Sequence, residues 1–248
     1  MNNLILHPNA TPVYGFLSFI NSQNLNGEGP QPNKILDCGA GGLIPPLALF
    51  QHHGFESWGI DISEEQLDKA KQFCRERGIE INLREGDMRH IPFEDEEFDY
   101  VYEHFSMCHL NKVDSAAAIL EMRRVLKPRG LCFLGVISTD SWPRSLFGEE
   151  REPGEYWGEE DGNQNVLHSM FKDEEADELV AGWEVLIKDK QVRYLREAAA
   201  QTSLEEWMKL LPEAEMKYPE EAWREKYAHR TNAYQYAHLY YLLKKTES

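Results

Sequence analysis

The sequence predicts an α/β fold in which a mainly parallel sheet is covered by helices on both faces. Short apolar segments with strand character alternate with helical segments up to about position 138. Parallel strands need a crossover helix between them, so this alternation indicates repeated βαβ units. A glycine-rich turn after the first strand is a second sign of this class. The 248 residues are sufficient for one core of substantial size.

The expected elements follow one another in a regular order. The segment Ser63-Glu64-Glu65-Gln66 has the pattern of a capping box, and Gly78 is a suitable helix stop. Paired prolines after the first strand fit the first turn of a helix. We expect an N-terminal helix around 13–20, strands at 34–38, 57–61, 80–84, 98–102 and 131–137, helices after the first and second strands, and a further helix through 116–125, with a turn at 127–130 before the fifth strand.

The C-terminal part of the chain has a different character. We expect residues 140–165 to be acidic and loop-like. For the acidic run at 149–161, the two interpretations are a lid over the acceptor and a solvated face. A helix near 173–180, a strand at 182–187, a charged helical cap within 204–232 and a closing strand follow. The predicted organisation is an N-terminal helix and linker (1–33) and one domain (34–248), with a core at 34–138, a variable substrate-side region at 140–234 and a closing strand at 236–244.

Composition excludes several classes of function. The net charge of −17 argues against nucleic acid, because binding to nucleic acid depends largely on basic side chains that neutralise phosphates. It also disfavours docking to anionic membranes. The four cysteines are scattered and form no CxxC pair, which favours reduced buried thiols. With no apolar run of spanning length and no leader pattern, we expect a cytoplasmic protein.

The first strand leads into the turn Asp37-Cys38-Gly39-Ala40-Gly41-Gly42-Leu43. Glycines let the backbone approach a ligand closely, and the next helix directs free N–H groups to the same place. A dinucleotide fingerprint would need a third glycine at Ile44. An S-adenosylmethionine turn would need one at Leu43. The turn alone therefore leaves the ligand open.

The ends of the next two strands narrow the choice of ligand. Asp61 ends the second strand, where a carboxylate can accept hydrogen bonds from both ribose hydroxyls. The third strand ends in Glu85-Gly86-Asp87-Met88, where an acid can accept from the exocyclic amine of adenine. Met88 or Ile62 would flank the ring. Acids at successive strand ends are not expected of an ordinary βα turn with surface carboxylates.

Taken together, residues 34–138 resemble the class I S-adenosylmethionine-dependent methyltransferases, in the broad small-molecule group. The resemblance implies a Rossmann-like sheet of order 3-2-1-4-5-7-6 with the last strand antiparallel, and S-adenosyl-L-methionine as cofactor. The blocks that carry it occur in the order and spacing of the family, at 35–41, 59–63, 86–88, 98–101 and 121–130.

The resemblance also implies cofactor-binding roles for individual residues. Asp37 and the turn residues Gly39, Ala40 and Gly41 would hold the methionine end. The ribose would lie on Asp61 and the adenine beside Ile62, Asp87 and Met88. The backbone around Glu103 would face the methionine amino group.

Methyl transfer from a sulfonium is an in-line displacement that needs mainly alignment and exclusion of water. A base is required where the acceptor must lose a proton, and the candidates are His104 and His109 after the fourth strand. A packed or hydrogen-bonded role is the alternative for each. Their five-residue separation does not fit the i, i+4 spacing of helix-borne zinc ligands, so we expect no metal. His168 could border the acceptor pocket or lie at the surface.

We therefore expect an enzyme that methylates a small-molecule acceptor. One alternative is a module that binds S-adenosylmethionine without turnover, alone or as a partner subunit. The other is a nicotinamide-dependent oxidoreductase, which Ile44 disfavours. The acceptor is not readable from the sequence.

Overall fold

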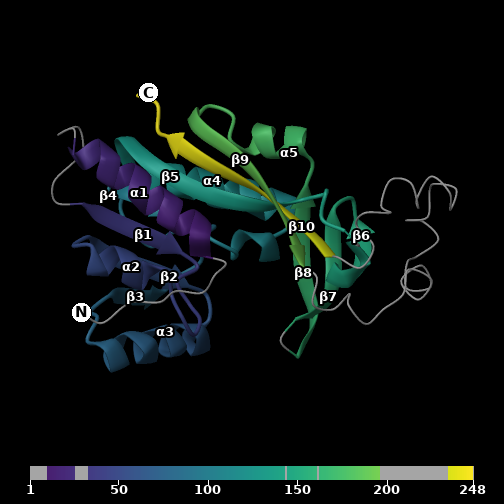
Figure 1. Ribbon diagram of the computed structural model, residues 1–248, viewed down its shortest axis with the longest axis horizontal. Coiled ribbons are helices and arrows are strands. Elements are labelled where there is room, and N and C mark those ends of the chain that lie inside the picture. The colour runs from purple at the N-terminus through teal and green to yellow at the C-terminus, as the bar shows by residue number, and fades with distance from the viewer. Residues whose placement is uncertain (1–9, 26–32, 143, 161, 196–233, 248) are drawn as a thin grey trace, which may run out of the picture.

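A single mixed sheet runs through the molecule and carries helices on its faces (Figure 1). The computed structural model describes residues 10–25, 33–142, 144–160, 162–195 and 234–247. The linker and the charged segment 204–232, which we expected to be a helical cap, fall largely or wholly outside the described residues. The helices are α1 (Thr11–Leu25), α2 (Leu47–His52), α3 (Glu64–Arg77), η2 (Met107–His109), α4 (Lys112–Val125), η3 (Arg144–Phe147) and α5 (Asp173–Leu179). The strands are β1 (Lys34–Cys38), β2 (Glu56–Asp61), β3 (Asn82–Glu85), β4 (Phe98–Tyr102), β5 (Leu126–Ser138), β6 (Glu149–Glu152), β7 (Glu155–Glu160), β8 (Asn163–Phe171), β9 (Glu184–Leu195) and β10 (Tyr234–Lys244).

The order of the main strands confirms the predicted topology. Strands β3, β2, β1, β4 and β5 are parallel neighbours. The closing strand β10 runs antiparallel to β5, and β9 lies outside it, antiparallel to β10. Counting β9 and β10 as the sixth and seventh strands gives the expected order 3-2-1-4-5-7-6. Because the strands at the centre of the sheet are parallel, their carboxyl ends lie at one edge.

The expectation of a loop at 140–165 is wrong for most of that segment. Strands β6, β7 and β8 form an antiparallel unit, and the end of β8 pairs in parallel with β5 at Ile137–Met170 and Ser138–Phe171. Figure 1 shows this unit at the end of β10 remote from α1. The acidic composition hid the strands because their outer positions are exposed, while Leu167, His168 and Met170 are buried.

Alternating side chains build a separate core on each face of the sheet. On β5, Leu131 and Phe133 pack on the face covered by α1 and α2, whereas Cys132 and Leu134 pack on the face covered by α4 and α5. This period of two is what a strand buried on both faces requires. From α1, Phe16 stacks on Phe133 with ring centroids 5.4 Å apart.

The predicted start and end of the helix after β2 are confirmed, whereas the predicted turn at 127–130 is not. The Ser63 hydroxyl accepts a hydrogen bond from the Gln66 N–H at 3.3 Å, and Gly78 ends α3 in the left-handed region. The expected turn at 127–130 lies instead within β5, where Arg129 has φ 64° and the pairing with β4 shifts register. A local bulge thus takes the place of a separate turn. Among the described residues, no helix has the length and apolar character needed to cross a membrane.

Candidate functional site

The turn after β1 passes so close to its neighbours that side chains are excluded from it. The N–H groups of Gly39 and Ala40 both donate to the carbonyl of Ile60, at 2.8 and 2.9 Å. Gly39 has φ 121°, and a Cβ at this position would lie 1.9 Å from the Ser106 Oγ. Both facts demand glycine there. The turn therefore presents bare backbone at the carboxyl edge of the sheet.

The third glycine of the turn is Gly42, one position before the expected position 43, and the backbone conformation explains this shift. Gly42 adopts φ 99°, so the left-handed position lies one residue before Leu43. Leu43 then needs no glycine, and 73 % of its surface is exposed. Ile62, after β2, is also exposed at 65 %. These apolar side chains lie on the two loops that follow β1 and β2.

Asp61 is held in place by two backbone donors at the end of β2. Its Oδ2 accepts from the Gly41 N–H at 3.0 Å, and its Oδ1 accepts from the Ser63 N–H at 2.9 Å. A carboxylate has about four acceptor sites, so each oxygen retains capacity for one further donor. A Cβ on Gly41 would lie 2.5 Å from Asp61 Oδ2. The glycine and the acid thus form one preorganised acceptor site.

Asp37 is almost completely buried beneath the turn. The Tyr102 hydroxyl donates to its Oδ2 at 2.5 Å. Burial raises the pKa of Asp37 from 3.8 to about 8, the nearby charges of Glu103 and Asp61 add to the rise, and the Tyr102 hydrogen bond opposes it. At neutral pH this carboxyl therefore carries a proton for much of the time. A cation beside it would favour its ionisation.

Glu103 has a structural task that its sequence context did not reveal. Its side chain is fully buried and accepts hydrogen bonds from the N–H groups of Ser106, Met107 and Gly135. Burial raises its pKa, although these three donors oppose the rise. The carboxyl joins the loop after β4 to β5. The predicted role of its backbone stays a prediction.

Asp87 is engaged more fully by protein groups than Asp61. Arg89 donates to both of its oxygens, with the closest contact 2.6 Å, and also donates from its backbone N–H at 2.9 Å. These bonds to Arg89 hold the pKa of Asp87 below its usual range. Arg89 reaches further to Asp114 at 2.9 Å. Adjacent Met88 is partly buried against the core, on the loop that follows β3.

The two candidate bases lie in different surroundings. His104 is half-buried, with its ring 4.2 Å from the Phe105 ring and stacked with Tyr240 at 6.4 Å. Phe105 has φ 64°, which is uncommon for a residue with a side chain. His109 turns toward the β7–β8 hairpin, where its Nδ1 is 2.9 Å from the carbonyl of Leu167. The structure thus separates the two histidines that the sequence grouped together.

Several contributors to this site had no signal in the sequence. Tyr102 read as an ordinary strand residue, although its hydroxyl bonds to Asp37. Ser106 read as part of a loop, although its hydroxyl donates to the Gly39 carbonyl at 3.4 Å. Both contacts join residues more than sixty positions apart. Only the parallel pairing of β1 with β4 brings them together.

Comparison with known proteins agrees with this geometry. A family described as "Methyltransferase domain" matches residues 36–134. A demethylmenaquinone methyltransferase from Staphylococcus saprophyticus is 38 % identical over 101 residues, which cover 40 % of this chain and 42 % of that protein. The chain thus spans less than half the length of the curated relatives it matches.

Solved structures extend the likeness to nearly the whole fold. A protein described as a SAM-dependent methyltransferase from Methanosarcina mazei superposes with a TM-score of 0.63 at 17 % identity, over 91 % of this chain and 98 % of that one. The 1,6-didemethyltoxoflavin N1-methyltransferase of Burkholderia thailandensis was solved with 1,6-didemethyltoxoflavin and S-adenosylhomocysteine bound. It superposes with a TM-score of 0.57 at 13 % identity, over 97 % and 79 % of the two chains. Residues 36–134 are thus similar to the methyltransferase domain family, and the solved methyltransferase structures share the fold of the chain.

Proposed function

We propose that this protein transfers a methyl group from S-adenosylmethionine to a small-molecule acceptor. The observation that carries the proposal is the paired site of Gly41 and Asp61. A carboxylate oriented by two backbone N–H groups, beside a turn with no side chains, suits a ribose diol lying over the backbone. Relatives and neighbouring structures named as methyltransferases support the same reading.

The residues around the turn fit the remaining parts of the cofactor. Asp37 lies beneath the turn, where the ammonium of a methionine moiety would favour the ionised form of its carboxyl. The exposed side chain of Ile62 suits one face of an adenine ring. Because Arg89 occupies both oxygens of Asp87, we assign Asp87 a smaller share of the binding free energy than Asp61. Met88 and the backbone near Glu103 complete the proposed cofactor set, with Gly39 and Ala40.

S-adenosylmethionine supplies an activated methyl group, so the protein contributes chiefly alignment and exclusion of water. An aromatic row along β10 supports an acceptor site beside the cofactor. Tyr236, His238 and Tyr240 stand at alternate positions of the strand, with neighbouring ring centroids 4.4 and 5.6 Å apart. Phe105 packs edge-on against His238 at 4.8 Å.

The chemistry of this row favours an uncharged planar acceptor. Burial lowers the pKa of His238 to about 3, with the charges of His104 and Arg193 acting in the same direction. The ring is therefore neutral at physiological pH. Neutral rings provide stacking surface and hydrogen-bonding atoms without a fixed charge. Of the two predicted bases, we assign the role to His104, since His109 is bound to the hairpin.

Calorimetry and a methyl-transfer assay test the proposal together. Wild-type protein is titrated with S-adenosylmethionine, with S-adenosylhomocysteine and with NADH, and then assayed against neutral planar acceptors. We expect binding of both sulfur compounds, no binding of NADH, and transfer to at least one acceptor. Replacing His104 with Asn should lower kcat by about 100-fold or more at unchanged affinity for S-adenosylhomocysteine, as expected for a lost base.

The same measurements separate the alternatives. Binding of NADH alone would replace the proposal with an oxidoreductase. Binding of the sulfur compounds without transfer to any acceptor would indicate a non-catalytic module. Full activity of the His104→Asn variant would remove His104 from the reaction and leave alignment as the main contribution.

A further inference from the structure

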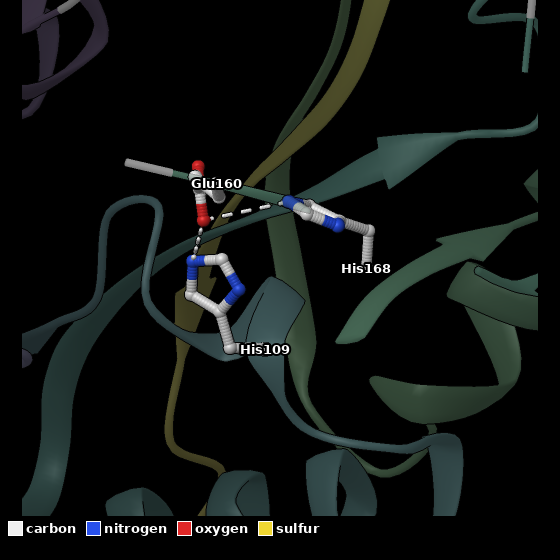
Figure 2. Close-up of side chains that lie close together, drawn as sticks. All are labelled: His109, Glu160 and His168. Atoms are coloured by element: carbon white, nitrogen blue, oxygen red, sulfur yellow. Dashed lines mark ion pairs between the residues drawn. The ribbon is translucent and has the colours of Figure 1, made fainter. Parts of the chain in front are cut away.

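Two histidines and a glutamate from separate elements meet on the acceptor side of the molecule. His109 lies on η2, Glu160 at the end of β7 and His168 on β8, and Figure 2 shows the two rings directed at one carboxylate oxygen. Glu160 Oε2 is 3.4 Å from His109 Nε2 and 3.5 Å from His168 Nε2. The ligating atoms of all three lie within 4.8 Å of one another. Pairing of β7 with β8, which fixes Tyr156 opposite His168, builds this meeting point.

The separations are long for hydrogen bonds and suitable for a shared ion. An N–H···O hydrogen bond is most often about 2.9–3.0 Å between heavy atoms. Zinc binds imidazole nitrogen and carboxylate oxygen at about 2.0–2.2 Å in tetrahedral sites, which puts neighbouring ligand atoms roughly 3.3–3.6 Å apart. The two separations from Glu160 Oε2 fall within this interval, and the ligand atoms of all three groups lie within 4.8 Å of one another. These distances are compatible with an ion shared by the three groups.

The tautomer of His109 is also suitable for binding a metal ion. Its Nδ1 lies 2.9 Å from the carbonyl oxygen of Leu167, which only accepts hydrogen bonds. Nδ1 therefore carries the hydrogen, and in the neutral ring the Nε2 lone pair faces the carboxylate of Glu160. Two electron-rich atoms in this position repel one another unless a proton or a metal ion lies between them. A backbone carbonyl on the far nitrogen is also the usual partner of a metal-bound histidine.

His168 is buried, whereas the side chain of Glu160 is open to solvent. His168 is buried, and its Nδ1 has no hydrogen-bond partner among the described residues, so its polar contact is the one at Nε2. Its ring packs 5.6 Å from Phe147 and 5.2 Å from His109, which fixes its orientation. The side chain of Glu160 is 46 % exposed, and that of His109 is 37 % exposed. One side of the cluster thus remains open to solvent.

The electrostatic surroundings favour a cation. The carboxylate of Glu160 faces both imidazoles. The neighbouring strands β6 and β7 add further exposed acids with one arginine among them. Clustered acids raise the local concentration of cations. The buried cysteines of the chain lie outside the three-residue cluster.

We propose that His109, Glu160 and His168 bind one divalent transition-metal ion, with Zn²⁺ as the best match. Two imidazoles and one carboxylate are a ligand set that zinc uses where a fourth position stays open. The ion fastens the β7–β8 hairpin to η2. Ser106, three residues before His109, touches the glycine turn through Gly39. The inference concerns metal binding and does not depend on the proposed methyl transfer.

Zinc titration of the tag-free full chain, stripped with a chelator, tests this site. We expect one Zn²⁺ per chain by calorimetry and by elemental analysis. His109→Ala, Glu160→Gln and His168→Ala should each weaken zinc binding by at least about 100-fold, since even the loss of outer-shell partners costs up to that factor. His52→Ala, an exposed histidine at the end of α2, is the matched control and should bind zinc as the wild type does.

A second measurement covers a variant that fails to fold. Cobalt bound to the wild-type protein should give visible d–d bands of a nitrogen and oxygen site without a thiolate charge-transfer band. A thiolate band would overturn the ligand set, because it would bring in a cysteine such as Cys108. Absence of saturable zinc binding to the wild type would overturn the site itself. So would wild-type affinity in any folded variant of the three ligands.

Discussion

The region that we assign to the cofactor (34–138) and the acceptor-side region (139–195 and 234–247) bury different ionisable groups. In the cofactor region the buried acids are Asp37, Asp99 and Glu103. In the described part of the acceptor-side region the buried ionisable groups apart from tyrosines are His168 and His238, while the carboxylates lie at the surface. Buried carboxylates bonded to protein donors give the first region a fixed geometry, whereas the second region buries imidazole rings. This difference is consistent with our proposals that the first region holds the cofactor and that the second holds the acceptor and a metal ion.

The largest expected effect comes from closing the glycine turn. Gly39→Ala places a Cβ within 1.9 Å of Ser106 Oγ and forces an alanine into φ 121°. We expect the affinity for S-adenosylhomocysteine, measured by calorimetry, to fall by at least about 100-fold, roughly 2.8 kcal/mol. Adding Ser106→Gly removes the overlapping atoms and should restore part of the affinity. A tight-binding single variant would show that the ligand does not lie on this turn.

Two acids in the cofactor region should differ in their effect on binding. Asp61→Ala should weaken the affinity for S-adenosylhomocysteine by at least about tenfold, roughly 1.4 kcal/mol, because its free acceptor sites face the turn. Asp87→Asn should have a smaller effect, since Arg89 already occupies that carboxylate. Calorimetry on both folded variants makes the comparison. The reverse ranking would mean that the adenine contact, not the ribose contact, dominates.

Protonation of Asp37 should give the cofactor region a distinctive pH dependence. Its pKa is about 8 in the folded protein against 3.8 for an ordinary aspartate. Between these values the folded state holds a proton that the unfolded chain has lost. Its stabilising contribution is therefore complete below about pH 4 and is lost as the pH rises through 8. Asp37→Asn should flatten this part of the stability profile in denaturant titrations.

Exposed Asp68→Asn on α3 is the control for that experiment, and its profile should follow the wild type. Ionisation of Asp37 beside a bound ammonium should also make cofactor affinity increase with pH up to about 8. An unchanged slope in Asp37→Asn would assign the pH dependence to another buried group, such as Glu103.

Surface charge in the acceptor-side region should matter least. Lys188 pairs with Asp177 at 2.7 Å, with side chains 33 % and 52 % exposed. Pairs of this kind contribute about 0–1 kcal/mol, because solvent screens them. A double-mutant cycle of Lys188→Ala and Asp177→Asn, followed by urea unfolding, should therefore give a coupling free energy within that range. A larger coupling would mean that this region also relies on charges held in fixed positions.

The difference between the cofactor region and the acceptor-side region also explains which elements the sequence could predict. Central strands of the cofactor region are buried on both faces, so apolar runs such as 34–38 and 98–102 identified them directly. Asp61 stood out because a strand end and a glycine turn have regular spacing. The hairpin strands β6 and β7 show exposed acids instead of an alternation of apolar and polar residues, so no period revealed them. Convergence of His109 with His168 depends on the contact of η2 with β8, which lie far apart in the chain.

Single residues show more clearly what a sequence pattern cannot predict. Leu43 was an irregularity in the sequence and became ordinary once Gly42 was found in the left-handed region. Glu103 was expected beside the cofactor through its backbone, yet its side chain bonds three N–H groups of the protein. A sequence pattern identifies which residue types gather at a strand end. It does not reveal which of their atoms are already engaged by the protein.

A crystal structure with S-adenosylhomocysteine would show whether the cofactor lies over the turn after β1. We expect the ribose hydroxyls within about 3 Å of the Asp61 carboxylate, the homocysteine over Gly39 and the adenine against Ile62. The sulfur should then face the row of Tyr236 and His238 on β10. A ligand bound elsewhere, or bound at this edge of the sheet without contact to Asp61, would overturn the assignment of Asp61 as the ribose site.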